Sequence, residues 1–342
     1  MRKVILLVMT LWIFPGILFS QIYVKNVSKV GTTSAPFLEI GIGARAIGMG
    51  GAFVALANDA SAMYWNPGGL AKLKNSSVLL EHSEWLAGIN FDYTNVILKL
   101  GELGTIGGSI TSLTMADQIV RTVDRPEGTG ERYSAGDLAV GLSYARSLTD
   151  RFSIGFNAKY IHQKIWHMTA SAFAIDFGTL FITQFRGLRI GASLSNFGTN
   201  MRLDGRDILV YHDIDPRIMG NNPRIPAELK TDSWALPLLF RLGVAMDVLN
   251  NAANRLTLAV DAQHPSDNAQ SLNVGSEYAF RNFFMVRIGY KSLFLQDGEE
   301  GLTFGAGLKQ SIYGMADIQV DYAFANFGRL KNIQKFSLQI LF

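Results

Sequence analysis

The chain has no cysteine among its 342 residues. Disulfide bonds, thiolate metal sites and thiol catalysis are therefore excluded, as is anchoring through a lipid-modified N-terminal cysteine. Charged residues are also scarce, at 17% of the chain, and the formal net charge is only +3. Because no basic cluster stands out, nucleic acid is not expected as a partner.

The chain also lacks a long apolar segment beyond its first twenty residues. An α-helix needs about 20 apolar residues to cross a bilayer, so a helical membrane protein is excluded. Residues 1–20 have the form of a secretory signal, with Arg2 and Lys3 before an apolar run. Pro15 interrupts this run, which favours a cleaved signal peptide over a single anchor helix.

Apolar residues alternate with polar ones along most of the remaining chain. The last strand is an example: one face carries Phe336, Leu338, Ile340 and Phe342, and the other carries Lys335, Ser337 and Gln339. This period of two is typical of a strand with one apolar and one wet face. A long series of such strands behind an export signal predicts a transmembrane β-barrel with an apolar outside and a polar lumen.

The connections between these strands support the same architecture. Long connections over residues 116–134, 198–232 and 291–301 alternate with tight turns at 101–103, 148–150 and 250–252. This rhythm is expected of long outer loops and short inner turns, and an even strand number returns Phe342 to the inner side. We predict an all-β fold: a fourteen-stranded antiparallel transmembrane barrel over residues 75–342.

Residues 21–74 are different, because they do not alternate and are rich in glycine and alanine. Small residues allow the backbone to pack closely in a confined space, so we predict a hatch inside the barrel lumen. A short helix is expected over residues 60–64 with Asn58 or Asp59 as its cap, followed by a turn. The residues of the predicted hatch motif are Arg45, Gly48, Gly50, Gly51, Asn58, Asp59, Trp65, Asn66, Pro67 and Gly68.

Three other patterns suggest chemistry that the rest of the sequence does not support. Gly41, Gly43 and Ala46 fit a dinucleotide-binding fingerprint, but no strand–helix–strand unit surrounds them. His212, Asp213 and Asp215 in the longest outer loop could hold a cation, although acidic loop residues are usually only solvated. No catalytic constellation is visible, so we expect no enzymatic activity, no metal site and no cofactor.

Three stretches of the hatch together resemble a known family. They are R-x-x-G-M-G-G-A-F from Arg45, N-D-A-S-A from Asn58 and W-N-P-G-G-L from Trp65. This segment resembles the N-terminal hatch of FadL-like outer-membrane proteins, and more closely that of the PorV/PorQ branch. The resemblance implies a fourteen-stranded barrel with the hatch inside, in the outer membrane of a Gram-negative-type envelope and in contact with its lipid.

The resemblance implies two alternative functions. PorV-like proteins of the type IX secretion system receive exported proteins, and such cargo or secretion components would then dock on the outer loops. The candidate docking residues are Arg202, Arg206, Tyr211 and Trp234. FadL-like proteins transport hydrophobic molecules such as long-chain fatty acids, and Phe53, Met63, Tyr64 and Trp65 would then line a pocket. An enclosed apolar cavity would favour transport, and its absence would favour docking.

Overall fold

The structure is a computed structural model that describes residues 29–215, 217, 219–220, 222–295, 298–312, 316–330 and 332–342. The predicted signal peptide and the first residues of the predicted hatch lie outside this part of the chain. Among the described residues, no helix is long and apolar enough to span a membrane.

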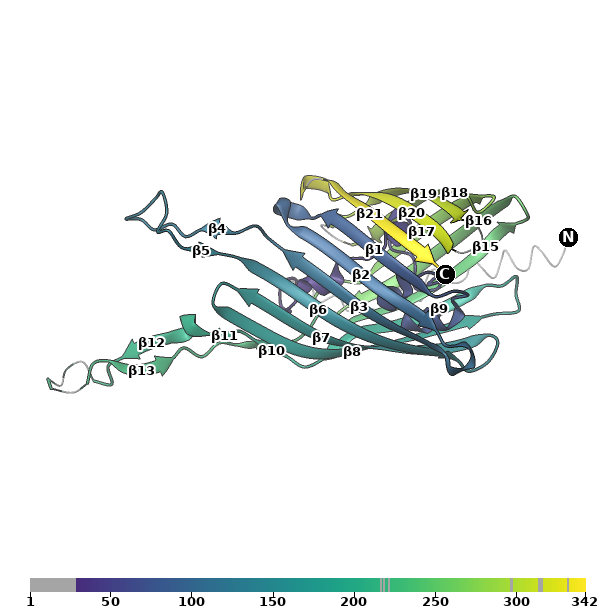
Figure 1. The fold of residues 1–342 in the computed structure, drawn as a ribbon. Helices are drawn as coiled ribbons and strands as arrows, with labels where there is room; N and C mark the ends of the chain where they lie inside the picture. Colours follow the sequence, from purple (N-terminus) through teal and green to yellow (C-terminus); the bar gives the residue numbers. More distant parts are fainter. Residues whose placement is uncertain are drawn as a thin grey trace, which may run out of the picture.

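Fourteen strands form a closed antiparallel barrel (Figure 1). They are β1 (Ser77–Glu84), β2 (Asn90–Lys99), β3 (Thr105–Thr114), β6 (Ala135–Ser147), β7 (Phe152–Ile165), β8 (Met168–Ile182), β9 (Arg189–Gly198), β15 (Leu239–Asn250), β16 (Asn254–Pro265), β17 (Ser271–Phe280), β18 (Phe284–Leu293), β19 (Leu302–Ile312), β20 (Ala316–Asn326) and β21 (Asn332–Leu341). The first strand pairs with the last, with His82 opposite Phe336, and this pairing closes the ring. The predicted fold is confirmed.

Side chains along these strands face alternately outward and inward, as the sequence pattern predicts. In β20, Val320 is 49% exposed, whereas Gln319 and Asp321 are buried. In β21, Phe336 is exposed and Lys335 is buried. The outer surface is therefore apolar, and the inner surface carries the polar residues.

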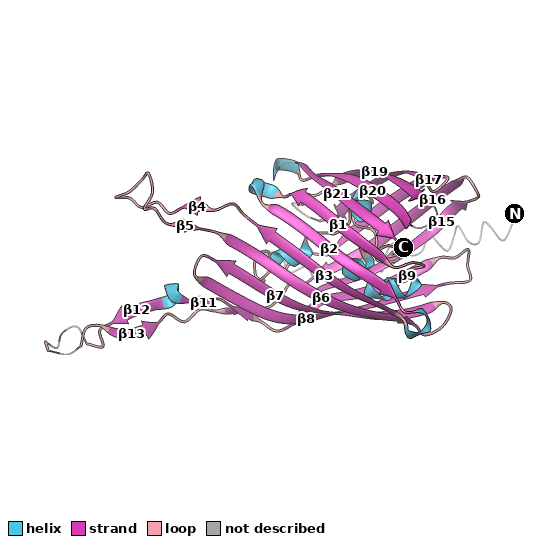
Figure 2. Cartoon of the chain, in the orientation of Figure 1, coloured by secondary structure: helices cyan, strands magenta, loops and turns pink. Residues whose placement is uncertain are grey.

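The two ends of the barrel differ in their connections. One end has tight turns, including η4 (Gly101–Leu103) and the turn after β15. At the other end two segments project far beyond the barrel wall (Figure 2). One contains β4 (Gln118–Ile119) and β5 (Arg132–Tyr133), and the other contains β10 (Met201–Arg202), β11 (Asp204–Gly205), η5 (Arg206–Ile208), β12 (Leu209–His212), β13 (Ile225–Glu228) and β14 (Ser233–Trp234).

Not every outer connection is long. β7 and β8 are joined at this end by Trp166 and His167 alone, and shorter outer loops carry η3 (Leu86–Gly88) and η6 (Gly328–Leu330). β11 pairs with the outer end of β8 and so ties the base of the longest projecting segment to the barrel wall. The terminal Phe342 lies at the opposite end, as predicted from the even strand number.

The hatch lies in the lumen and contains η1 (Pro36–Glu39), α2 (Ala44–Gly48), α3 (Ala62–Trp65) and η2 (Pro67–Lys72). α2 packs on β19 and β20, and η2 packs on β6, β7 and β8. The predicted helix over 60–64 is displaced, because α3 begins only at Ala62. Asp59 is not its cap: its Oδ1 accepts the backbone N–H and the hydroxyl of Ser61, at 2.9 and 2.6 Å, and closes the preceding turn.

Candidate functional site: the hatch and the outer loops

Arg45 of α2 holds the central part of the hatch motif together. Its Nη1 lies 2.8 Å from Asn58 Oδ1 and 3.0 Å from Asp59 Oδ2. Its Nε donates to Glu277 Oε2 on the barrel wall at 2.7 Å. Two parts of the motif, Arg45 and the Asn58-Asp59 pair, therefore bind each other, and Arg45 also joins the hatch to β17.

Glu277 is the centre of a larger buried ion network. Arg287 of β18 donates to it at 2.8 Å, and Arg255 of β16 donates at 3.0 Å. Arg287 also donates to Asp321 of β20 at 2.7 Å. With Arg45 and Asp59, the network contains three arginines and three carboxylates, so its charges balance. Removing one member would leave a buried charge without a partner, which is costly.

A second ion pair joins the hatch to the two terminal strands. Lys335 of β21 donates to Glu81 of β1 at 2.6 Å, and both side chains are buried. The other carboxylate oxygen of Glu81 accepts the backbone N–H of Gly43 in the hatch. The Lys335 ammonium also lies 4.4 Å from the ring centre of Phe91. The closing strands of the barrel and the hatch therefore share one polar contact.

Side chains also satisfy the irregular backbone of the hatch. The amide of Asn66 donates to the carbonyls of Val54 and Thr179, and its Oδ1 accepts the N–H of Gly68 at 3.0 Å. Asp261 of β16 accepts the N–H groups of Phe53 and Val54 at 2.7 and 2.8 Å. Because non-repetitive backbone in a lumen has no ladder partners, these bonds replace the missing ones.

The glycines of the motif lie where the hatch backbone touches the barrel wall. A Cβ at Gly48 would lie 2.9 Å from the Cα of Gly305, and one at Gly68 would lie 2.7 Å from the carbonyl oxygen of Gly178. Gly50 has a φ of +67° and is in similarly close contact with Tyr290. Neither the hatch nor the facing wall has room for a side chain at these points, so the backbone of the hatch packs directly against the backbone of the barrel wall.

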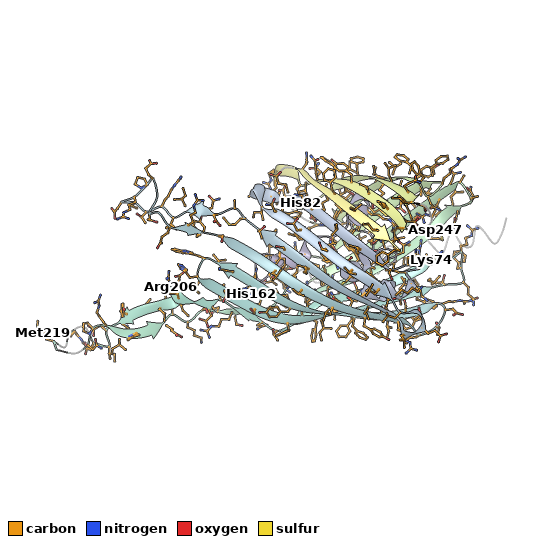
Figure 3. All side chains as sticks on the ribbon, in the orientation of Figure 1. Lys74, His82, His162, Arg206, Met219 and Asp247 are labelled. Atoms are coloured by element: carbon orange, nitrogen blue, oxygen red, sulfur yellow. The ribbon has the colours of Figure 1, made fainter. Side chains whose placement is uncertain are left out.

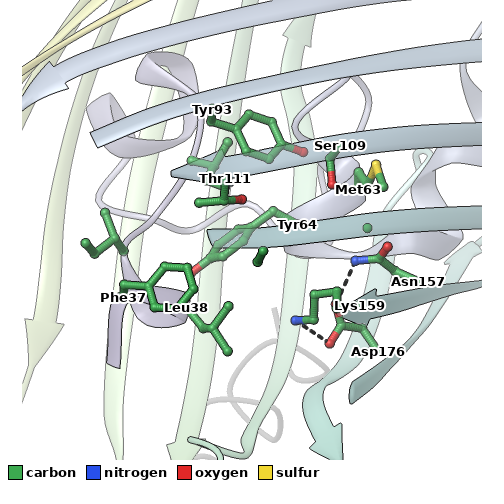
Figure 4. Close-up of a pocket in the computed structure, with 14 residues that line it drawn as sticks. Phe37, Leu38, Met63, Tyr64, Tyr93, Ser109, Thr111, Asn157, Lys159 and Asp176 are labelled. Carbon is green, nitrogen blue, oxygen red and sulfur yellow. Dashed lines mark hydrogen bonds and ion pairs between the residues drawn. The ribbon is translucent and has the colours of Figure 1, made fainter. Parts of the chain in front are cut away.

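The residues predicted to line a ligand pocket divide into two groups. Phe53 is fully buried in the hatch core, where its ring packs against Trp65 and beneath the Arg45 guanidinium. Met63 and Tyr64 do line a cavity between the hatch and the wall (Figure 4). A buried ion pair between Lys159 and Asp176, at 2.8 Å, forms its polar edge.

This cavity is small. Its water-accessible volume is about 30 Å³, although it is lined by the apolar side chains of Phe37, Leu38 and Met63. That is space for one or two water molecules, whereas pockets for drug-sized ligands are typically about 300–1,000 Å³. In this conformation the cavity beside Met63 is far smaller than the pocket that a long hydrophobic molecule needs.

All four predicted docking residues lie on the longest outer segment, but they are spread along it and do not form one cluster. Arg202 donates to Thr231 at 2.9 Å in the base of the segment, next to the half-exposed Trp234. Arg206, which is labelled in Figure 3, contacts the ring nitrogens of His167 at the tip of the β7–β8 hairpin. Tyr211 lies farther out, in β12, and is 69% exposed.

Sequence reasoning did not identify the barrel-wall residues of the buried ion contacts around the hatch, namely Glu277, Arg287 and Glu81. Each is a charged residue at an inward-facing position of an alternating strand, and that pattern could have pointed to them. Among the residues that the structure describes, no group of three or more His, Cys, Asp or Glu side chains could hold a metal ion.

Comparison with known proteins identifies the family. Residues 24–265 match the family model described as type IX secretion system protein PorV. The chain belongs to the PorV family. No curated protein matches the sequence. The family assignment agrees with the motif resemblance found in the hatch.

Solved structures show the same fold at low sequence identity. A FadL homologue from Pseudomonas aeruginosa aligns with a TM-score of 0.50 and 11% identity, over 86% of this chain and 96% of that chain. The toluene transporter TodX of Pseudomonas putida gives 0.52 and 11%, over 88% and 96%. The CymD monoaromatic hydrocarbon channel gives 0.52 and 12%, over 88% and 97%. Family and fold together support an outer-membrane barrel concerned with transport or secretion.

Proposed function

We propose that this PorV-family protein is a non-enzymatic outer-membrane barrel that binds exported proteins at the cell surface and passes them on in type IX-like secretion. The barrel anchors the protein in outer-membrane lipid, and the outer segments form the docking surface. No step of this role requires chemistry by the barrel itself.

The observation that carries the proposal is the filled lumen. The hatch is held by the Arg45–Glu277 network and by close backbone contacts at its glycines, and the cavity beside Met63 has room only for water. If the barrel were a transport channel, these buried contacts would have to break before a ligand could pass. Breaking a buried ion pair costs about 3–5 kcal/mol of free energy.

The outer segments have the opposite character, which supports a role in docking. Tyr211 is 69% exposed and Ile214 is 74% exposed, with Arg224 stacked on the Tyr211 ring at 5.3 Å. Aromatic residues and arginines dominate the energetics of protein–protein interfaces. Large exposed apolar side chains on a projecting segment are typical of an interaction surface.

The alternative function is transport of a hydrophobic small molecule, such as a long-chain fatty acid. It is favoured by the solved structures, several of which are named as hydrocarbon channels or transporters. For this role the cavity beside Met63 and Tyr64 would have to enlarge about tenfold to reach the usual size of a ligand pocket.

The test is affinity purification of the mature protein from its native outer membrane in mild detergent, with mass spectrometry of proteins and lipids. We expect secretion-system components or large exported proteins to co-purify. The double variant Tyr211→Ala/Trp234→Ala should lose them, since interface aromatics each contribute about 2 kcal/mol or more when they are hot spots.

The matched control is Leu148→Ala/Phe185→Ala, which removes two exposed apolar side chains at the inner end of the barrel. This variant should retain the co-purifying proteins. A barrel that purifies alone, with a stoichiometric fatty acid or other hydrophobic molecule, would contradict docking and support transport.

A further inference from the structure

A second cavity opens at the outer mouth of the barrel, on the outer surface of the hatch. Glu39 and Trp65 of the hatch line it, together with inward-facing residues near the outer ends of β15 to β18, among them Arg241, Gln263 and Asn273. Its water-accessible volume is about 160 Å³. It is therefore larger than the cavity beside Met63, and amide and hydroxyl side chains form much of its wall.

Arg241 of β15 is the unusual residue of this cavity. It is only 4% exposed, and its guanidinium lies 5.2 Å and 5.1 Å from the ring centres of Tyr64 and Trp65. Its only hydrogen bonds in the described part of the chain are long contacts to the hydroxyls of Tyr64 and Ser195, at 3.3 and 3.5 Å. Its Nε is buried without an acceptor.

Arg241 also has no directly paired carboxylate among the described residues. No carboxylate of the described residues lies within 4.0 Å of it. Other arginines in the lumen differ: Arg45, Arg189, Arg255 and Arg287 each have a carboxylate at 2.7–3.0 Å. A buried charge without a partner is costly, so such residues are rare unless a ligand supplies the partner.

The acidic groups nearby are engaged elsewhere. Asp261 accepts two N–H groups of the hatch, and Glu300 accepts from Lys291 and Ser292. Asp267 accepts the hydroxyl of Thr33. Burial and the nearby Asp267 raise the pKa of Glu39 to about 7, so near neutral pH much of this carboxyl is uncharged. Among the described residues, no carboxylate is therefore hydrogen-bonded to Arg241, and Asp261 and Glu39 act on its charge only through space.

We propose that this cavity binds a carboxylate carried by a hydrophilic ligand, either a small molecule or the end of a peptide, with Arg241 as the anion-binding group. A guanidinium presents two parallel N–H groups that match the two oxygens of a carboxylate. Stacking on Tyr64 and Trp65 fixes its plane in advance. Gln263, Asn273 and Ser271 supply donors and acceptors for the rest of a polar ligand.

The size and lining of the cavity define the ligand class. About 160 Å³ fits a molecule of amino-acid size and is too small for a long acyl chain, and polar and apolar side chains share the wall. The cavity opens toward the outer side, where the strands β15 and β17 begin. The inference stands independently of the proposed docking role.

The test is calorimetric titration of the intact protein, in detergent or nanodiscs, with N-acetylglycine and with N-acetylglycinamide as the uncharged control. We expect the carboxylate to bind at least tenfold more tightly than the amide. A second pair of probes, the peptide Ac-Gly-Ser-Gly with a free and with an amidated C-terminus, distinguishes the sources. Preference for the free peptide over N-acetylglycine assigns the site to a chain end, and the reverse preference assigns it to a small molecule.

Arg241→Gln should lower the affinity for the carboxylate probe at least tenfold, and Arg241→Lys should restore only part of it. The matched control is Arg189→Gln, an inward-facing arginine at the inner end of the barrel that is paired with Asp247. It should leave binding unchanged. Failure of both carboxylate probes to bind the native protein, or equal binding to Arg241→Gln, would overturn the proposal.

Discussion

The hatch and the longest outer segment are both irregular insertions into the same barrel, yet they are built in opposite ways. The side chains of the hatch are almost all buried, and Arg45, Asn66 and Trp65 each form hydrogen bonds to parts of the chain far away in sequence. In the segment between β9 and β15, Tyr211 and Met219 are exposed, and β12 pairs only with β13. One region is fixed, and the other is presented to the outside.

This difference supports the proposed division of roles between the two regions. Regions with few buried contacts open or rearrange at low free-energy cost, whereas densely contacted regions open only at a cost near that of global unfolding. By this criterion the outer segment can adapt to a partner, and the hatch is part of the structural core. Four predictions test this contrast, beginning with the largest expected effect.

Glu277→Ala should have the largest effect, because it leaves Arg45, Arg255 and Arg287 without their shared carboxylate. We expect a loss of about 3–5 kcal/mol in the free energy of unfolding, measured by denaturant titration in lipid vesicles. Lys309→Ala is the control. The side chains of Lys309 and its ion-pair partner Asp317 are each about one-third exposed, so this pair should contribute at most about 1 kcal/mol. Equal effects would contradict a buried anchor at Glu277.

Gly289→Ala should have the next largest effect on the free energy of unfolding. A Cβ at Gly289 would overlap the backbone nitrogen of Gly50 in the hatch, so either the wall or the hatch must move. Overpacking of this kind costs about 1–3 kcal/mol. Gly108→Ala is the matched control: it faces outward in β3 and would meet nothing closer than 3.9 Å. If the two alanines had the same effect on unfolding, the hatch would not be fitted against the wall.

Glu39 gives the hatch a dependence on pH. Its pKa is raised from 4.5 to about 7 in the folded protein, mainly by burial. The carboxyl is uncharged in both states below about pH 4.5, so the local stability of η1 is highest there, falls between about pH 4.5 and 7, and levels off above 7. Hydrogen exchange of residues 37–41, corrected for intrinsic rates, should accelerate at least about tenfold between pH 5 and 8. Glu39→Gln should remove this acceleration, and its persistence in that variant would assign it to another group.

Replacing residues 209–228 with a short Gly-Ser linker should have the smallest effect on stability. This segment holds the β12–β13 hairpin, which pairs with no barrel strand. We expect a change within about 0.5 kcal/mol in the unfolding titration, together with loss of the co-purifying secretion components. A strongly destabilised barrel would mean that the projecting segment is structural and that the contrast with the hatch is false.

Much of the fold follows from local sequence patterns. The facing of β20 and β21 was predictable because apolar and polar residues alternate without interruption around Val320 and Phe336. The position of the tight turns was predictable for the same reason, since the alternation stops there. The hatch was recognisable because its glycines and short side chains interrupt the two-residue alternation. The family resemblance of its motif implied a position inside the barrel.

The chemistry inside the barrel was not predictable in the same way. Arg45 and Glu277 are separated by 232 residues, so no local pattern relates them. The start of α3 at Ala62 was missed because the Asp59–Ser61 turn competes with a helix cap. The lack of a directly paired carboxylate at Arg241 is visible only when the neighbouring side chains have been placed. Pairing across a closed barrel is a property of the three-dimensional arrangement.

Hydrogen–deuterium exchange of the intact protein in nanodiscs, with and without its co-purified secretion partners, tests the central claim most directly. The account predicts that the hatch amides over residues 42–57 and 60–70 stay equally protected in both states, while residues 199–238 gain protection when the partners bind. Loss of hatch protection on binding, without a change in the outer segment, would contradict it.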